Sequence, residues 1–242
     1  MKAFEFFSAK RQQFAQRAQA AFAQYKEAKK QRGMTLLEVI IVLGIIGTIA
    51  AGVVVLAQRA FDSRTISDLV QKTNTVRVAV KDVYSRSASY PAVNSTGTIG
   101  LTNTNITEEG QRGIATAALV QLGKLTIDEV RNPISNDFML IGGAKTTEKA
   151  TVDKGFVIEL NGLDQSQCRN IIQQVGNNWD YVAVGNAAAG SYATNGSINM
   201  SAAATGQILR SLAADGNKTI DAAAVLTVCQ NGASNSVILG SR

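Results

Sequence analysis

The apolar residues divide the chain into three regions. Residues 34–57 form a continuous apolar run with a single charged side chain, Glu38. At about 1.5 Å per helical residue the run would extend roughly 36 Å, enough to cross a bilayer with some tilt. The pattern therefore predicts a leader over residues 1–33, a membrane-spanning helix over residues 34–57, and a longer soluble region after it.

The helical pattern continues beyond this run. Apolar residues recur at helical spacing from Ile66 to Val83, and no proline occurs before Pro91. Such spacing predicts an amphipathic helix with one buried face. We therefore expect one continuous helix from about residue 35 to residue 87, with an amphipathic half over residues 58–87.

Charged residues also cover this amphipathic half, and we interpret them as a solvated or subunit-facing surface. Two pairs, Asp68–Lys72 and Asp82–Arg86, have the spacing of favourable ion pairs on a helix. The basic side chains outnumber the acidic ones. The basic residues are Arg59, Arg64, Lys72, Arg77, Lys81 and Arg86, and the acidic residues are Asp62, Asp68 and Asp82.

The remaining residues, 88–242, indicate a globular head with mixed helices and strands, so the fold class is α+β. Asp164 and Gln167 have the spacing of a capping box, which predicts a helix through about Val175 that contains Cys168. Another capping-box sequence begins at Thr126. The other expected elements are a short helix near residues 117–122 and strands near residues 138–141, 156–160 and 180–184.

All the excess positive charge of the chain lies before the apolar run. The chain has a formal charge of +6, and residues 34–242 carry equal numbers of acidic and basic side chains. A basic flank stays on the cytoplasmic side of a membrane, so the head is expected to be exported. The neutral charge of residues 34–242 argues against a nucleic-acid partner. The helix-prone, basic leader also suits an organellar transit peptide, but a full-length span would not follow one at once.

Export affects the interpretation of the two cysteines, Cys168 and Cys229. An oxidising compartment favours a disulfide between them, and the alternative is two buried free thiols. The chain contains no histidine, the commonest general base and metal ligand, and it shows no constellation of a nucleophile with a base. We therefore expect neither enzymatic activity nor a cofactor or metal.

The stretch "RGMTLLEVIIVLGIIGTIAAGVVVLAQRAF" resembles the amino-terminal signature of type IV pilins. The resemblance implies cleavage by a prepilin peptidase after Gly33, methylation of the new terminus at Met34, and a glutamate at the fifth mature position, Glu38. The long leader and Met34 resemble the type IVb branch, which includes the longus, colonization-factor and toxin-coregulated pilins of enteric bacteria. Further similar segments are "AQRAFDS" (57–63), "NGLDQSQC" (161–168) and the closing Cys229.

This resemblance implies a type IV pilin fold, in which the outer half of the long helix packs against an antiparallel sheet. It implies the precursor of a major pilin that waits in the inner membrane and then polymerises with itself into an extracellular fibre on a Gram-negative cell. Adhesion, aggregation and host colonisation would follow. The implied partners are the prepilin peptidase, an assembly ATPase, a platform protein, a secretin pore and minor pilins. The alternative is a minor pilin or a type II secretion pseudopilin.

Three features leave specific questions for the structure. A buried acid costs about 2.5–3.5 kcal/mol at a bilayer centre, so we hypothesise that Glu38 pairs with the new amine of Met34, in its own chain or a neighbour, and fixes subunit register. The glycines of the apolar run allow either close helix packing or an ordinary anchor. The low-complexity segment 185–206 is either a tolerant surface loop or an adhesive patch.

Overall fold

The computed structural model describes residues 36–93 and 98–242. The chain forms two units, the first ending at Gln58 and the second comprising Arg59–Arg242. Helix α2 (Leu36–Tyr84) contributes residues to both units. We call residues 36–58 the apolar half of α2 and residues 59–84 the head half. The head is the rest of the second unit, and each unit is described by itself.

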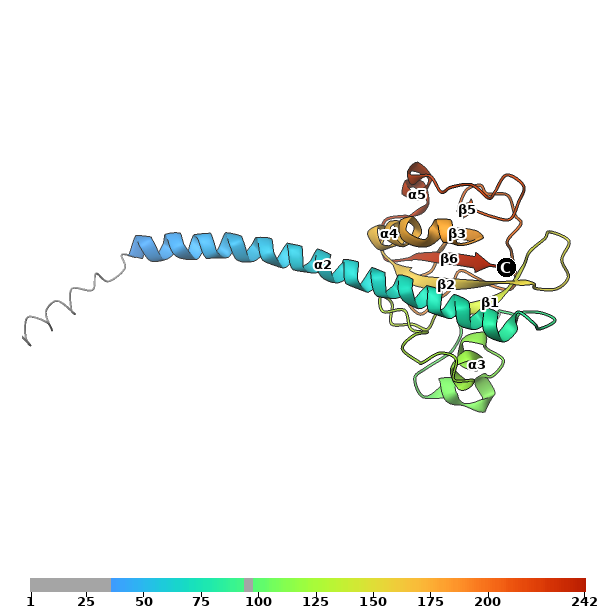
Figure 1. Ribbon diagram of the computed structural model, residues 1–242. Helices are drawn as coiled ribbons and strands as arrows, with labels where there is room; N and C mark the ends of the chain where they lie inside the picture. Colours follow the sequence, from blue (N-terminus) through green and yellow to red (C-terminus); the bar gives the residue numbers. More distant parts are fainter. Residues whose placement is uncertain (1–35, 94–97) are drawn as a thin grey trace, which may run out of the picture. The chain divides into compact units, whose positions relative to one another are not determined.

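The long helix predicted from the sequence is confirmed (Figure 1). At 49 residues it extends about 74 Å, given a rise of about 1.5 Å per residue. It ends at Tyr84 rather than at residue 87, where the amide of Ser87 donates to the carbonyl of Tyr84 at 2.9 Å in a tight turn. Serine competes for backbone hydrogen bonds and has a low helix propensity, so the serine-rich stretch after Tyr84 favours this earlier end.

The head is built on one sheet with the strand order β4-β1-β2-β6-β3-β5. The pairings are antiparallel, apart from the short parallel pairing of β1 with β4. The strands are β1 (Leu140–Lys145), β2 (Gly155–Leu163), β3 (Tyr181–Asn186), β4 (Ile198–Asn199), β5 (Ile208–Arg210) and β6 (Asn235–Ser241). The three strands predicted from the sequence correspond to β1, β2 and β3, whereas β4, β5 and β6 were not predicted.

Strand β6 completes the sheet from the end of the chain. It lies between β2 and β3 and pairs with both, for example through Ile238 opposite Glu159 and Ala183. Every residue of β6 is buried. The centre of the sheet therefore forms only when the last segment of the chain is in place.

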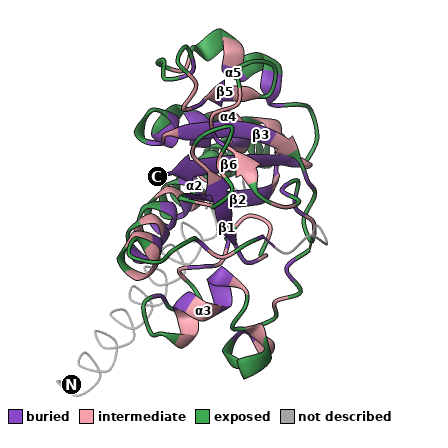
Figure 2. Ribbon diagram, turned by 90° about the vertical axis from the view of Figure 1, so that its right-hand side faces the viewer, coloured by how far each residue is buried: buried purple, intermediate pink, exposed green. Residues whose placement is uncertain are grey.

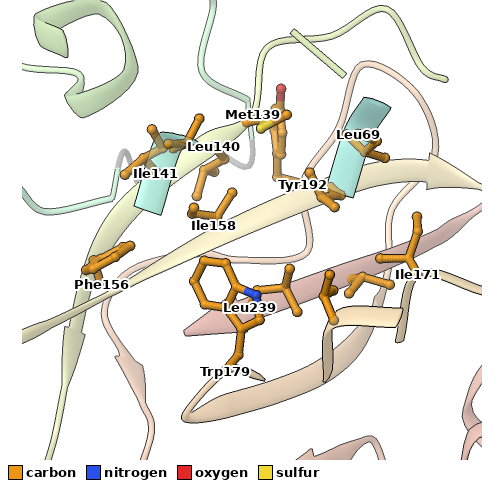
Figure 3. Close-up of a cluster of buried hydrophobic side chains, with 14 of the residues drawn as sticks. Leu69, Met139, Leu140, Ile141, Phe156, Ile158, Ile171, Trp179, Tyr192 and Leu239 are labelled. Atoms are coloured by element: carbon orange, nitrogen blue, oxygen red, sulfur yellow. The ribbon is translucent and has the colours of Figure 1, made fainter. Parts of the chain in front are cut away.

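One face of the sheet packs against helices. The head half of α2 buries Ile66, Leu69, Val76 and Val80 in the same apolar cluster as alternate residues of the central strands. Figure 3 shows part of this cluster, and Figure 2 shows the strands as mostly buried and α2 as partly buried. Burying each such side chain contributes about 1.5–3 kcal/mol. Burial of these apolar side chains is therefore the main interaction that holds the head half of α2 on the sheet.

The other face of the sheet has a smaller apolar cluster, because side chains alternate between faces along a strand. This cluster centres on Met200, which is fully buried. A side chain at either Gly155 or Gly240 would meet Met200, at 2.3 Å and 2.6 Å respectively. The two glycines therefore provide the space that lets the segment around Met200 cover the sheet.

The helices of the head are short. The predicted helix after Asp164 is confirmed, and both hydrogen bonds of its capping box with Gln167 are present. The helix near residues 117–122 is also confirmed, whereas α5 was not predicted. The α-helices are α3 (Ala115–Gln121), α4 (Gln165–Val175) and α5 (Ala222–Val228), and the 3-10 turns are η1 (Asn105–Thr107), η2 (Glu109–Gln111) and η3 (Gly176–Asn178).

The prediction of a helix that starts at Thr126 is wrong. Its capping contacts do form, since Glu129 accepts hydrogen bonds from the amide and hydroxyl of Thr126 at 2.7 Å and 2.9 Å. The chain nevertheless makes only a turn. Pro133 explains this outcome, because a proline disfavours helical backbone at the residue before it and lacks an amide to continue the helix.

Candidate functional site

The apolar half of α2 leaves its large apolar side chains exposed. Leu36 is 78% exposed and Leu56 is 67% exposed, and the mean hydropathy of the membrane-length window reaches 2.9. Within the described part of the chain, α2 is the helix long and apolar enough to cross a membrane. Because continuous apolar surface is unfavourable in water, this half requires lipid or other apolar helices around it.

Glu38 lies in the first described turn of α2 and is exposed. A carboxylate at this end of a helix interacts favourably with the helix dipole. Gly33 and Met34 lie outside the described residues. The proposed cleavage, the methylation of Met34 and the pairing with Glu38 therefore stay predictions.

The glycines of the apolar half face open space. A side chain added at Gly44, Gly47 or Gly52 would meet nothing within 4 Å. Among residues 36–93 and 98–242, no contact therefore requires glycine at these positions. Small residues in apolar helices permit close approach of a second helix, and that interpretation stays open beside the ordinary anchor.

The head half of α2 attaches to the head through Arg77. Its Nη1 donates to the carbonyl of Asn178 at 2.8 Å, and its Nε and Nη2 lie 3.2 Å and 3.1 Å from Oγ of Ser241. The guanidinium lies 4.7 Å from the ring centre of Trp179, a cation–π contact. The sequence interpretation of this charge as a solvated or subunit-facing surface is therefore wrong for Arg77.

Lys72 is a second basic residue that contacts the head. Its Nζ lies 3.2 Å from Asp68 and 3.0 Å from Asp128, and its side chain is 10% exposed. The Asp68–Lys72 pair is the one predicted from helix spacing. Asp128, in the turn that follows Thr126, gives the ammonium a second carboxylate and joins α2 to that turn.

The second predicted pair has a different partner. Asp82 lies 2.7 Å from Lys124, instead of pairing with Arg86. The helix ends at Tyr84, so Arg86 no longer lies one helical turn beyond Asp82, which explains the exchange. Both partners of the observed pair are about half exposed, and such pairs contribute little stability.

A disulfide joins Cys168 on α4 to Cys229 at the end of α5, with an S–S distance of 2.04 Å. Both cysteines are buried, at 0% and 1% exposure. The surrounding contacts reinforce the link. Nε2 of Gln165 donates to the carbonyl of Cys229 at 3.0 Å, and Nη2 of Arg169 donates to that of Leu226 at 3.2 Å. The predicted bridge therefore fastens α5 to α4.

The low-complexity segment 185–206 is fixed to the sheet. Glu159 on β2 is fully buried, and its carboxylate accepts hydrogen bonds from the amides of Ala193 and Thr194 at 2.7 Å and 2.8 Å. Hydrogen bonds to a charged acceptor are about twice as strong as neutral ones. The structure thus corrects the view of a freely tolerant loop, while an adhesive role for its exposed residues stays a prediction.

Two buried tyrosines in this region have raised pKa values. Burial raises the pKa of Tyr192, with further contributions from the carboxylates of Asp137 and Glu159, and its hydroxyl donates to the carbonyl of Phe138. Burial also raises the pKa of Tyr181 to about 12. Both groups are therefore neutral phenols at any physiological pH.

The described residues offer little for chemistry at a metal. Among residues 36–93 and 98–242, no group of three or more histidine, cysteine, aspartate or glutamate residues is placed to bind a metal ion. Both cysteines are consumed by the disulfide. The features that stand out are an exposed apolar helix and a disulfide-bonded sheet head.

Comparison with known proteins identifies this combination. Residues 118–238 match the family described as toxin-coregulated pilus subunit TcpA. The toxin coregulated pilin of Vibrio cholerae is 38% identical over 174 residues, which covers 72% of this chain and 71% of that relative. The chain belongs to the toxin-coregulated pilus subunit family. The corresponding protein of Vibrio cholerae serotype O1 is 37% identical over 186 residues, with 76% of each chain covered.

Two further findings extend the assignment of this pilin. Residues 28–54 match the prokaryotic N-terminal methylation motif. The crystal structure of TcpA, a type IV pilin from the El Tor biotype of Vibrio cholerae, superposes with a TM-score of 0.57 at 25% identity, covering 74% of this chain and 99% of that one. The head and α2 thus have the type IV pilin fold that the resemblance implied.

One further residue, not predicted from the sequence, organises the disulfide region of the pilin. Asn235, at the start of β6, donates through Nδ2 to the carbonyls of Leu163, Gln230 and Gly232, and its Oδ1 accepts from the amide of Gln230 at 2.8 Å. These bonds fix the path from Cys229 into the central strand. One buried asparagine among many exposed ones gives no sequence signal, since its role depends on contacts distant in the chain.

Proposed function

We propose that this pilin is the precursor of the major structural subunit of a type IVb pilus. The observation that carries the proposal is the combination, in one helix, of an exposed apolar half within a methylation motif and a head half attached to a pilin sheet. The subunit has a structural role without enzymatic activity. Its polymers are fibres that mediate adhesion, bacterial aggregation and host colonisation.

The first step is processing of the leader. A prepilin peptidase cleaves after Gly33, and the new amino terminus at Met34 is methylated. The match of residues 28–54 to the methylation motif supports this step. Before processing, the basic leader stays on the cytoplasmic side and the apolar half lies in the inner membrane.

Amino-terminal sequencing and intact mass of protein sheared from the cell surface test this step. We expect a chain that begins at N-methylated Met34 and weighs two hydrogens less than the reduced form, because of the Cys168–Cys229 disulfide. A surface protein that still begins at Met1 would contradict the proposed processing.

The second step is polymerisation. The apolar halves leave lipid and pack against one another, which buries the surface that is exposed in the monomer. Glu38 then enters an environment without water, where a charge is strongly unfavourable unless it is paired. The methylated amine of Met34, from the same or a neighbouring subunit, offsets this charge, and one axial stagger of neighbouring subunits satisfies both groups.

The variants Glu38→Ala and Glu38→Gln test this pairing. Each should insert into the membrane and fold its head, yet give far fewer fibres, because the partner amine is left buried and uncompensated. Leu37→Ala provides a matched control in the same turn, with the charge intact. Wild-type fibre yield from cells that express only a Glu38 variant would refute the role in registration.

The abundance of this pilin in sheared fibres tests its assignment as the major subunit. We expect it to form the bulk of the fibre mass, and its deletion to abolish fibres. Trace abundance, or fibres that persist after deletion, would favour a minor pilin or a secretion pseudopilin. The assembly ATPase, platform protein, secretin pore and minor pilins are the partners that such assembly requires.

A further inference from the structure

The chain contains three Asn-Gly dipeptides: Asn161–Gly162, Asn195–Gly196 and Asn231–Gly232. Asparagine followed by glycine can undergo a spontaneous reaction with its own backbone, because glycine has no side chain to hinder approach of its amide nitrogen to the asparagine side chain. The three dipeptides share the same reacting groups. Differences between them must therefore come from the fold.

The fold protects the first dipeptide. Asn161 is 1% exposed, and its Nδ2 donates to a carboxylate oxygen of Asp137 at 2.7 Å and to the carbonyl of Ser191 at 2.8 Å. The amide of Gly162 donates to the carbonyl of Ala187 at 3.0 Å. Both reacting groups are thus held in hydrogen bonds, and reaction requires local unfolding.

The other two dipeptides lack this protection. Asn195 and Asn231 are both exposed. Within residues 36–93 and 98–242, neither asparagine side chain makes a hydrogen bond, and neither do the amides of Gly196 and Gly232. Water reaches both sites, and the nucleophilic nitrogens are not occupied by an acceptor.

We propose that Asn195 and Asn231 are sites of spontaneous deamidation, and that the fold preserves Asn161. The deprotonated amide nitrogen of the following glycine attacks Cγ of the asparagine and forms a new C–N bond. The bond from Cγ to the side-chain nitrogen breaks, and this nitrogen leaves as ammonia. Water then opens the five-membered imide at either carbonyl, which gives aspartate or isoaspartate.

The reaction changes the charge of a nearly neutral molecule. Residues 34–242 contain equal numbers of acidic and basic side chains, and each conversion adds one negative charge. The new carboxylate at position 195 directly follows Thr194, and the amide of Thr194 donates to the buried Glu159. The other lies two residues beyond Cys229. The net charge of the subunit therefore becomes more negative as the protein ages. This inference does not depend on the proposed function.

Peptide mapping of aged protein tests the proposal. The full chain, oxidised and in detergent, is incubated at mildly alkaline pH, and asparagine, aspartate and isoaspartate are separated at each site over time. Conversion at Asn195 and Asn231 should be at least about ten-fold faster than at Asn161. Asn161 reacts only from a locally unfolded state, and the folded chain populates that state for a small fraction of the time. In reduced, denatured chain the three rates should become similar.

Two results with the wild-type chain would overturn the proposal. One is conversion of Asn161 in the folded chain at the rate of the other two sites. The other is stability of Asn195 and Asn231 over a period in which the denatured chain converts. The double variant Asn195→Gln with Asn231→Gln serves as the control, since glutamine would need a slower six-membered ring closure. It should fold normally and lose the acidic shift of aged protein on isoelectric focusing, and persistence of that shift would also count against the assignment.

Discussion

The two halves of α2 show how one helix serves two different environments. The apolar half has a single ionisable side chain, Glu38, and large apolar residues that are 38–78% exposed. The head half alternates apolar residues at 0–2% exposure, such as Leu69 and Val76, with charged residues on its other faces. The head half has its partner in the same chain, whereas the apolar half requires lipid or other subunits. Stability of the head and assembly of the fibre should therefore be separable by mutation.

Removal of the disulfide has the largest expected effect on this separation. The double variant Cys168→Ser with Cys229→Ser should lower the free energy of unfolding of the head by about 4 kcal/mol, from the entropy of the 61-residue loop in the unfolded chain. Trp179 is the single tryptophan and is buried, so its fluorescence reports the head in denaturant. Circular dichroism in detergent should show that the apolar half stays helical when the head unfolds. A complete loss of helix together with the fluorescence change would show that the two halves of α2 unfold together.

Truncation of one leucine in each half makes the comparison direct. Leu69→Ala, at a site with 0% exposure, should destabilise the head by about 3 kcal/mol through lost burial and a new cavity. Leu43→Ala, at 62% exposure, should change head stability by less than about 0.5 kcal/mol. Urea unfolding followed by Trp179 fluorescence measures both. Equal effects of the two variants would show that the halves are energetically coupled.

Arg77 should have a smaller effect, confined to the attachment of the head half. Arg77→Ala removes hydrogen bonds to Ser241 and the carbonyl of Asn178, together with the contact on Trp179. The expected loss is about 2 kcal/mol. Arg64→Ala, at an exposed position of the same helix, provides the matched control and should be neutral. A neutral Arg77→Ala would mean that apolar burial alone attaches the helix.

Local signals in the sequence predicted the elements whose causes are local. Helix α2 follows from apolar spacing without proline, and α4 follows from Asp164 and Gln167, whose capping box forms as predicted. The disulfide followed from two cysteines in an exported region. The helix at Thr126 failed because Pro133, a few residues further on, overrides a correct capping signal.

The features that the sequence analysis missed depend on contacts distant in the chain. Strand β6 follows a loop of small residues and is fixed by pairing with β2 and β3. The role of Arg77 depends on residues more than one hundred positions away. In the segment 185–206, the buried Met200 and the amides bound by Glu159 could not be separated from exposed neighbours of similar composition.

Alkaline pH gives the smallest and most selective test of the comparison. Burial raises the pKa of Tyr181 to about 12, above its ordinary value of about 10. The neutral phenol therefore contributes stability that is complete below about pH 10 and is lost as the pH rises through about 12. The apolar half has no group that titrates in this window, so alkaline unfolding should report the head alone.

Tyr181→Phe isolates this contribution, since no hydrogen bond of the Tyr181 hydroxyl occurs among the described residues. The variant should match the wild-type pilin near neutral pH and resist alkaline unfolding better, with the fluorescence transition of Trp179 moved to higher pH. Lysines and the other tyrosines also titrate there, so the shift should be modest. Because the phenylalanine fills nearly the same volume, superimposable alkaline transitions for the two proteins would show that ionisation of Tyr181 does not limit the stability of the head.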